Sequence, residues 1–145
     1  MKYHICDAKK KDYPCLIEIW EKSVRATHDF LPEEEITELK PKILDTYFDA
    51  TLLRCSRNQD GHVVGFIGLL NDKIEMLFVS PEVQGQGIGT ALCKDAIEHY
   101  GIAKVDVNEQ NHRAKVFYEK LGFKAISRSE LDEQGKPYPI LHMKK

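Results

Sequence analysis

Long hydrophobic runs are absent from this sequence. The longest, VVGFIGLL at residues 63–70, is far shorter than the roughly 20 apolar residues that a membrane-spanning helix needs. The first residues, MKYHICDAKKKDYP, contain no apolar stretch of the kind that a secretory signal peptide carries. We therefore expect a cytoplasmic protein that has no membrane partner.

Closely spaced metal ligands are also missing. The six histidines show no H-x-x-x-H spacing, and the four cysteines, Cys6, Cys15, Cys55 and Cys93, include no C-x-x-C pair. These absences argue against a zinc ribbon or a thioredoxin-like motif. We expect no metal site and reduced, mostly buried thiols.

An excess of positive charge is lacking as well. The formal net charge is −2, so no global basic field is available to hold a nucleic acid or an anionic membrane. The 145 residues, 42% hydrophobic and 30% charged, are typical of one soluble globular domain. Without repeats or Pro/Gly/Ser-rich linkers, residues 1–145 are expected to form a single domain.

Hydrophobic periodicity and turn residues predict the order β-αα-βββ-α-β-α-ββ. The expected strands at 73–80 and 103–108 are joined by the helix at 87–100. They should run parallel, because a strand-helix-strand crossover connects them. The expected fold is α/β (α+β), with a mixed, mostly antiparallel sheet of about seven strands flanked by about four helices. Strands are expected at 3–8, 51–57, 62–70, 73–80, 103–108, 123–131 and 138–144, and helices at 14–30, 31–48, 87–100 and 111–121.

Three glycines at alternate positions, Gly85, Gly87 and Gly89, stand in VSPEVQGQGIGTAL between an expected strand and an expected helix. Glycine allows a positive φ and a close approach of backbone to ligand. The unpaired N–H groups of the first helical turn, together with the helix dipole, favour an anion. The loop therefore predicts a phosphate-binding cradle.

Two kinds of phosphate loop can be compared with these residues. A P-loop requires G-x-x-x-x-G-K-S/T, and no Gly-Lys-Ser/Thr follows here. The dinucleotide fingerprint G-x-G-x-x-G/A fails at its sixth residue, which is Thr90 counted from Gly85 and Leu92 counted from Gly87. Asp106 does stand about 20 residues further on, where a ribose-binding acid would be, so this alternative stays open.

A third pattern, Q/R-x-x-G-x-G/A, is met by QGQGIG at 84–89. Together with NHRAKVFYEKLGF at 111–123, it resembles the GNAT superfamily of acetyl-CoA-dependent N-acetyltransferases. The order of elements is similar to that fold from about residue 3 to residue 143. The C-terminal RSELDEQGKPYPIL further resembles a bacterial subgroup of the family.

The resemblance implies an acyltransferase in which an amine attacks acetyl-CoA directly, without a metal or an acyl-enzyme. The glycine loop would bind the pyrophosphate of coenzyme A through backbone N–H groups, although Gln84 lacks the charge of the arginine often found there. The preceding strand would offer free backbone groups to the pantetheine arm. The implied cofactor-binding residues are Leu77, Phe78, Val79, Gln84, Gly85, Gln86, Gly87, Ile88, Gly89, Thr90, Asn111 and Tyr118.

Two side chains are the catalytic candidates. The resemblance implies that Tyr118 protonates the departing thiolate, which is chemically suitable because thiol and phenol pKa values lie close together. Glu75 is the candidate base for the attacking amine, and we expect it to share a strand face with Leu77 and Val79. Both have a structural alternative: Tyr118 could be a packing residue and Glu75 a solvated carboxylate. The cofactor-binding candidate Asn111 could likewise be a helix N-cap.

The acceptor is expected to be a small-molecule or peptide amine, and the oligomeric state a monomer or homodimer. In this fold the acceptor site lies between the N-terminal helices and the last hairpin, so Trp20, His28, Asp29 and Tyr138 are candidates. The acidic run PEEEITE could attract a cationic acceptor. The competing hypothesis is a catalytically silent acyl-CoA sensor on the same fold, which would need only the loop from Gln84 to Thr90.

Overall fold

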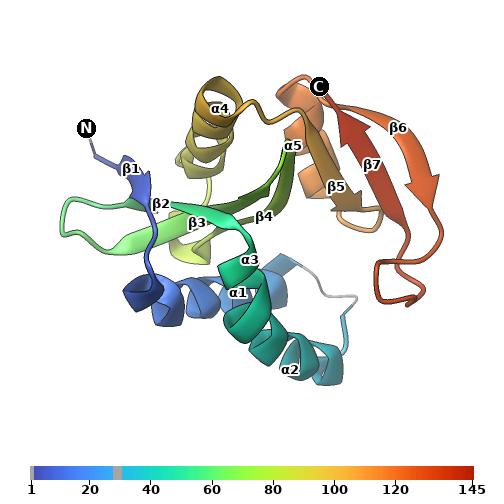
Figure 1. Cartoon of the computed structure of the whole chain (residues 1–145), viewed down its shortest axis with the longest axis horizontal. Coiled ribbons are helices and arrows are strands. Elements are labelled where there is room, and N and C mark those ends of the chain that lie inside the picture. Colours follow the sequence, from blue (N-terminus) through green and yellow to red (C-terminus); the bar gives the residue numbers. More distant parts are fainter. Residues whose placement is uncertain (1, 28–30) are drawn as a thin grey trace.

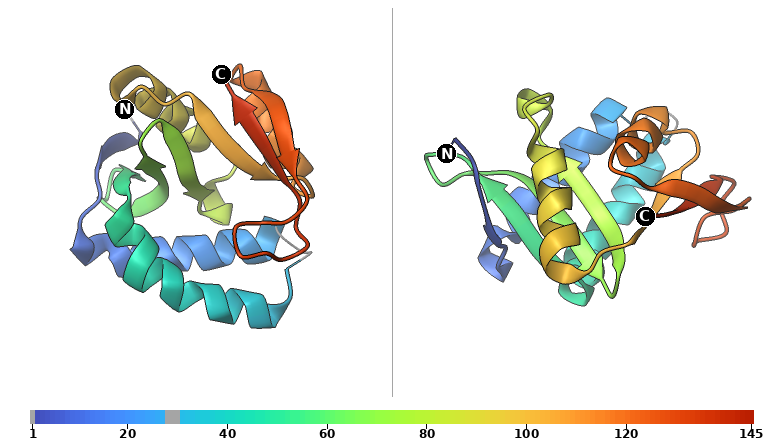
Figure 2. Two further views of the ribbon diagram at one scale, coloured as in Figure 1. Left: turned by 45° about the vertical axis from the view of Figure 1, so that its right-hand side comes forward. Right: turned by 90° about the horizontal axis from the view of Figure 1, so that it is seen from above.

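The computed structural model describes residues 2–27 and 31–145 as a three-layer α/β structure (Figure 1). The N-terminal helices cover one face of a central sheet, and α4 lies over the central strands on the other face (Figure 2). The elements are β1 (His4–Asp7), α1 (Tyr13–Thr27), α2 (Glu33–Lys42), α3 (Phe48–Ala50), β2 (Leu52–Arg57), β3 (Val63–Leu70), β4 (Lys73–Val79), α4 (Ile88–Tyr100), β5 (Lys104–Asn108), α5 (His112–Lys120), β6 (Lys124–Ser129) and β7 (Ile140–Lys144).

This order confirms the expected fold class, with seven strands in the sheet. The strand order is β1-β2-β3-β4-β5-β7-β6, and β4 and β5 are its parallel pair. Helix α1 begins where the sequence predicts, but the end of the expected 14–30 helix lies outside the described residues. The expected 31–48 helix is interrupted after Pro41, whose missing N–H removes a helical hydrogen bond, by a π-helical turn at Ile43–Tyr47.

The parallel strands β4 and β5 stay together for only a short distance. Within the described chain they pair at Lys73 with Lys104 and at Ile74 with Val105, and nowhere beyond. At the same point the β3–β4 register shifts, because Leu69 pairs with Ile74 but Gly68 pairs with Met76. Glu75 is therefore the extra residue of a β-bulge, a feature that bends a strand and increases its twist. The two strands separate just after this bulge.

The bulge corrects one expectation. Strict alternation predicted that Glu75 shares a face with Leu77 and Val79. Instead Ile74 packs in the same hydrophobic cluster as Leu77 and Val79, while Met76 packs on the opposite side of the sheet. The extra residue shifts the alternation by one position, and no local propensity in the sequence marks it.

Two hydrophobic cores lie on the two faces of the sheet. One joins α4, α5 and the sheet around Leu92, Ile67 and Phe123, all nearly without exposed surface. The other joins the N-terminal helices to the sheet, where Phe48 and Phe66 meet edge to face at 5.7 Å. Of the cysteines, Cys55 and Cys93 are buried and Cys15 is exposed, so the expectation of mostly buried thiols holds for half of them.

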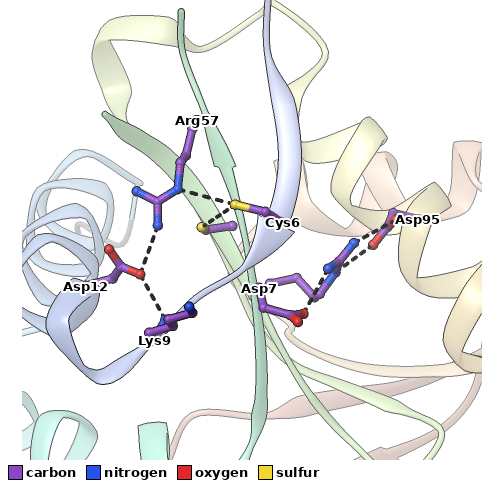
Figure 3. A network of polar contacts seen from close by, with 8 residues as sticks. Cys6, Asp7, Lys9, Asp12, Arg57 and Asp95 are labelled. Carbon is purple, nitrogen blue, oxygen red and sulfur yellow. Dashed lines mark hydrogen bonds and ion pairs between the residues drawn. The ribbon is translucent and has the colours of Figure 1, made fainter. Parts of the chain in front are cut away.

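A partly buried ion pair connects the first strands to the segment that enters α1 (Figure 3). Arg57 Nη2 donates to Asp12 Oδ2 at 2.9 Å, and the Lys9 backbone N–H donates to the same oxygen at 2.9 Å. Arg57 Nε also donates to Cys6 Sγ at 3.3 Å. Burial alone would raise the pKa of Asp12, but the hydrogen bonds from Lys9 and Arg57 outweigh it and lower that pKa below its usual value.

We expect this pair to make stability depend on pH. A lowered folded-state pKa means that Asp12 stabilises the fold above its unfolded pKa and that this stabilisation is lost as the pH falls through the folded pKa. Arg57→Met should lower the free energy of unfolding by about 2 kcal/mol at pH 7, because it removes a charge-assisted bond to a buried carboxylate. The loss of unfolding free energy caused by Arg57→Met should become smaller below pH 4, as Asp12 becomes protonated.

Denaturant unfolding at pH 7 and at pH 3 measures this difference. Arg25→Met is the control, since its ion pair with Glu33 is exposed and should contribute much less. An equal loss for Arg57→Met at both pH values would contradict the assigned role of Asp12.

Candidate active site

The end of β4, the glycine loop and two helix starts enclose a cavity of about 350 Å³, here called the loop cavity. It includes residues of β4 beyond the last β4–β5 pair. Among the described residues, its walls contain one charged side chain, Arg113, and no carboxylate. The lining residues are Ser23, Leu77, Phe78, Val79, Val83, Gln84, Gly85, Gly87, Ile88, Gly89, Thr90, Asn111, Arg113, Ala114, Phe117 and Tyr118.

The glycine loop has the conformation that its sequence requires. Gly85 and Gly87 both have φ of +81°, a left-handed conformation that strains any residue with a Cβ. Gly87 is the N-cap of α4, and its carbonyl accepts the first intrahelical bond from the Ala91 N–H at 3.0 Å. The N–H groups of residues 88 to 90 therefore have no intrahelical acceptor and line an anion-binding helix start.

Gly89 differs from its two neighbours. Its φ is not left-handed, and a Cβ added there would lie 3.5 Å from Phe117 Cζ and 3.7 Å from Val79 Cγ2. These are ordinary van der Waals distances, so neither the backbone conformation nor the available space requires a glycine at this position. Gly89 lines the loop cavity together with Phe117 and Val79.

The last residues of β4 present backbone to the loop cavity. On one edge, β4 is paired with β3 as far as Val79, and the Ser80 N–H continues this pairing to the Val64 carbonyl at 2.8 Å. On the other edge, no strand pairs with the described residues of β4 after Ile74. Leu77, Phe78 and Val79 thus combine packed side chains with a free strand edge, and Gln84 Nε2 donates to the Val79 carbonyl at 3.3 Å.

Two of the expected cofactor-binding side chains have other partners. Gln86 does not line the loop cavity, and its Oε1 accepts hydrogen bonds from the Tyr3 hydroxyl and Lys2 Nζ. Asn111 lines the cavity and also caps α5, since its Oδ1 accepts from the Ala114 N–H at 3.1 Å. The structural alternative for Asn111 is therefore present, and it leaves the residue at the cavity wall.

Tyr118 lies on the wall of the loop cavity with only 6% of its surface exposed. Its ring meets Phe117 edge to face, with centroids 5.0 Å apart, and Phe123 at 5.7 Å. Burial, with a smaller contribution from Cys93, raises the pKa of the Tyr118 phenol well above its usual value. The hydroxyl therefore keeps its proton at neutral pH.

Five wall residues were missing from the sequence-based set: Ser23, Val83, Arg113, Ala114 and Phe117. Arg113, Ala114 and Phe117 belong to the 111–123 motif, so their spacing along α5 could have indicated them. Ser23 comes from α1, far before the glycine loop in the sequence, and no local signal connects it to the cavity.

A second cavity of about 430 Å³, here called the acidic cavity, lies between α2, the separated strands and the last hairpin. Among its described wall residues, five carboxylates face one lysine and one histidine. Lys136 Nζ pairs with Glu35 at 3.7 Å and so connects the β6–β7 loop to α2. The lining residues are Leu31, Glu35, Leu39, Tyr47, Ile74, Glu75, Asp106, Ser129, Leu131, Asp132, Glu133, Gln134, Lys136, Tyr138, Ile140 and His142.

Glu75 belongs to the acidic cavity and does not line the loop cavity. Partial burial raises the pKa of its carboxyl above the usual value; Lys73 opposes this shift, while the charges of Glu133 and Asp106 add to it. A raised pKa brings a carboxylate closer to the range in which it can accept a proton from an amine.

The other expected acceptor residues differ in their positions. Tyr138 lines the acidic cavity, as does Glu35 from the acidic run. Trp20 does not: only 4% of its surface is exposed, and it packs in the core beneath the N-terminal helices. His28 and Asp29 lie outside the described residues.

Asp106 decides against the dinucleotide alternative. A ribose-binding acid would have to face the glycine loop. Asp106 instead lines the acidic cavity, where Lys73 and His142 bind its two oxygens.

Comparison with known proteins agrees with this geometry. The chain matches the model of the acetyltransferase (GNAT) domain over residues 24–145, and it belongs to this family of N-acetyltransferases, which use acetyl-CoA as co-substrate. The peptidyl-lysine N-acetyltransferase YjaB of Salmonella typhimurium is 41% identical over 143 residues, covering 99% of this chain and 98% of that protein.

Solved structures show the same fold. The solution structure of apo-form YjaB from Escherichia coli is similar with a TM-score of 0.91 and 38% identity, covering 99% of this chain and 97% of that one. PaiA N-acetyltransferase from Thermoplasma acidophilum, determined with coenzyme A, has a TM-score of 0.78 at 23% identity, covering 100% of this chain and 99% of that one. At that identity the likeness concerns the fold.

The described residues contain neither a helix that could span a membrane nor a cluster of metal ligands. No helix in 2–27 or 31–145 combines the length and apolar character needed to cross a membrane. In the same part of the chain, no three His, Cys, Asp or Glu side chains are grouped so that they could hold a metal ion.

Proposed function

We propose that residues 1–145 form one acetyltransferase domain that transfers the acetyl group of acetyl-CoA to the side-chain amine of a lysine in a peptide or protein. Coenzyme A would occupy the loop cavity, and the lysine would enter from the acidic cavity. The peptidyl-lysine activity named for the 41% identical relative supports this acceptor class.

The observation that carries the proposal is the opposite charge of two cavities on one strand. Ile74 and Glu75 line the acidic cavity, and Leu77 to Val79 line the loop cavity, so one residue of β4 separates the two walls. The loop cavity offers a helix start and Arg113 to an anion such as a pyrophosphate. The acidic cavity offers carboxylates to an ammonium group.

The residues then divide the work of the reaction. Backbone N–H groups between Gln84 and Thr90 would hold the pyrophosphate, and the free edge of Leu77 to Val79 would align the pantetheine arm. Glu75 would act as counter-ion and base for the amine, whose lone pair must be freed before it attacks. Tyr118 would protonate the thiolate as the carbon–sulfur bond breaks.

Release of free thiol from acetyl-CoA, measured with matched peptides, tests this proposal. Each peptide contains one lysine and a blocked N-terminus, and its neighbours are either basic or acidic. We expect kcat/KM at least about tenfold higher for the basic peptide, because each added charge contributes roughly 1 kcal/mol near a carboxylate. Mass spectrometry should place the acetyl group on the lysine side chain.

Glu133→Gln should reduce that preference about threefold, since Glu133 lines the acidic cavity, whereas Glu130→Gln, a neighbouring exposed residue outside it, should not. Equal turnover of basic and acidic peptides would contradict the role of the acidic cavity. Turnover of free amines with none of either peptide would contradict the acceptor class.

A further inference from the structure

A continuous chain of hydrogen-bonded side chains lies on the wall of the acidic cavity. Ser129 Oγ is 2.7 Å from His142 Nε2, and His142 Nδ1 is 2.8 Å from Asp106 Oδ1. Lys73 Nζ pairs with the other Asp106 oxygen. Ser129, His142 and Asp106 all line the cavity, so the chain is open to a molecule bound there.

The strand order of the sheet builds this chain from distant parts of the sequence. β7 lies between β5 and β6, and Asp106 on β5 is directly opposite His142 on β7. On β6, Ser129 pairs with Ile140, which places it diagonally next to His142. A register shift between Ala125 and Ser127 sets this alignment. Three neighbouring strands thus each contribute one polar side chain to one face.

The direction of each hydrogen bond follows from the donors available. A carboxylate can only accept, so Asp106 requires the proton of His142 to be on Nδ1. In the neutral ring Nε2 is then an acceptor, and the Ser129 hydroxyl donates to it. Ser129 Oγ still has lone pairs, so it could take a proton from a bound molecule while passing its own to His142.

The chain includes a residue next to the point where β4 and β5 separate. Ile74 and Val105 form the last β4–β5 pair, so Glu75 and Asp106 are the first residues after the strands separate. In the proposed arrangement, the amine passes this point on its way to a thioester that lies along the free edge of β4. Glu75 and the Ser129–His142–Asp106 chain are thus two proton-accepting groups on one cavity wall.

We propose that Ser129, His142 and Asp106 form a second acceptor for the proton of the substrate amine, acting in parallel with Glu75. This inference rests on the proposed function, because it requires the amine to enter through the acidic cavity. Ser129 touches the amine, His142 stores the proton, and Asp106 is a positioning residue that orients the imidazole and stabilises its charged form.

The proton steps balance. The ammonium gives one proton to Ser129 Oγ while the original Ser129 proton moves to His142 Nε2, which leaves a neutral amine and an imidazolium. The amine then forms the carbon–nitrogen bond, the carbon–sulfur bond breaks, and Tyr118 gives its proton to the sulfur. The second proton lost by nitrogen restores Tyr118, and His142 releases the first to water.

Charged groups on several neighbouring elements surround the imidazole of His142 and would act on its charged form. Glu35 on α2, Glu75 on β4, and Asp132 and Glu133 on the β6–β7 loop favour it. Lys73 and Lys136 oppose it, although each is paired with a carboxylate. These carboxylates thus outnumber the lysines.

Ser129→Ala, with Ser127→Ala as the matched control on the same strand, tests the proposal. Both are made in the full-length protein and in the Glu75→Gln variant, and kcat is measured on an amine that the wild type acetylates. We expect Ser129→Ala to reduce kcat about tenfold at pH 7, and about a hundredfold when Glu75 is already replaced, because two parallel routes are then closed. The KM for acetyl-CoA should not change.

The reduction of kcat by Ser129→Ala should depend on the fraction of the substrate amine that is already neutral. It should fall below about threefold at pH 9.5, and it should also be smaller for a peptide in which lysine is replaced by S-(2-aminoethyl)cysteine, a less basic amine. A structural defect would show neither dependence. A loss equal at all pH values, or one matched by Ser127→Ala in both backgrounds, would overturn the relay.

Two further results separate this inference from the proposed function. The His142 Nδ1–H should give a slowly exchanging proton signal in NMR spectra that disappears in Asp106→Asn; its absence from the wild type would overturn the relay whatever the activity. Wild-type turnover of lysine peptides with no effect of Ser129→Ala would overturn the relay alone. An acetyl group found on Ser129 itself would replace the relay with a covalent route.

Discussion

Tyr118→Phe is expected to reduce kcat for acetyl transfer by about 10²- to 10³-fold while leaving the affinity for coenzyme A unchanged. The substitution removes one hydroxyl from a ring that keeps its contacts with Phe117 and Phe123, so the cavity wall should retain its shape. The loss has the size usually observed when a general acid is removed. Thiol release and calorimetric titration with coenzyme A measure the two quantities separately.

The control for this prediction is Tyr13→Phe. This substitution also removes one tyrosine hydroxyl, which donates a hydrogen bond to Asp49 Oδ1 at 2.8 Å. Tyr13 is at the start of α1 and lines neither cavity. The kcat of the Tyr13→Phe variant should stay within about twofold of the wild-type value, as expected for a site remote from the reacting atoms. A Tyr118→Phe variant with wild-type kcat would show that Tyr118 serves for packing. Tight coenzyme A binding by a wild type that turns over no amine would favour the acyl-CoA sensor.

Replacing Gly85 and Gly87 together by alanine is expected to weaken coenzyme A binding about 100-fold. Both glycines have positive φ, and a Cβ there costs about 1–2 kcal/mol per residue unless the backbone turns away. Such a turn would redirect the N–H groups that face the loop cavity. A total of nearly 3 kcal/mol corresponds to a hundredfold change in the dissociation constant.

The matched control is the double variant Gly61→Ala, Gly135→Ala. These glycines also have positive φ and open space around the missing Cβ, but neither lines the loop cavity. Both double variants should lose similar thermal stability, and only the first should lose affinity for coenzyme A. Equal affinity in the two would mean that the glycine loop is a helix-capping turn without a role in binding.

Much of the fold and one of the two cavities could be predicted from the sequence. The glycines and the helix at 111–121 are local patterns, and nearly all of the residues they indicated line the loop cavity. Gln86 is an exception because its side chain reaches residues near the start of the chain. Trp20, a candidate for the acceptor site, does not line the acidic cavity because its indole is buried in the core. The positions of Glu75 and Ser23 depend on partners far away in the sequence.

The sequence by itself determined the order of elements, the glycine conformations at Gly85 and Gly87 and the family, because periodicity, φ preferences and short motifs are local properties. The tertiary structure alone decided where β4 leaves β5, since the bulge at Glu75 exists only in the register against β3. It also decided that Asp106, Ser129 and His142 meet, because β7 inserts between β5 and β6. Pairing between distant strands is set by the packing of the whole sheet, and no short stretch of sequence encodes it.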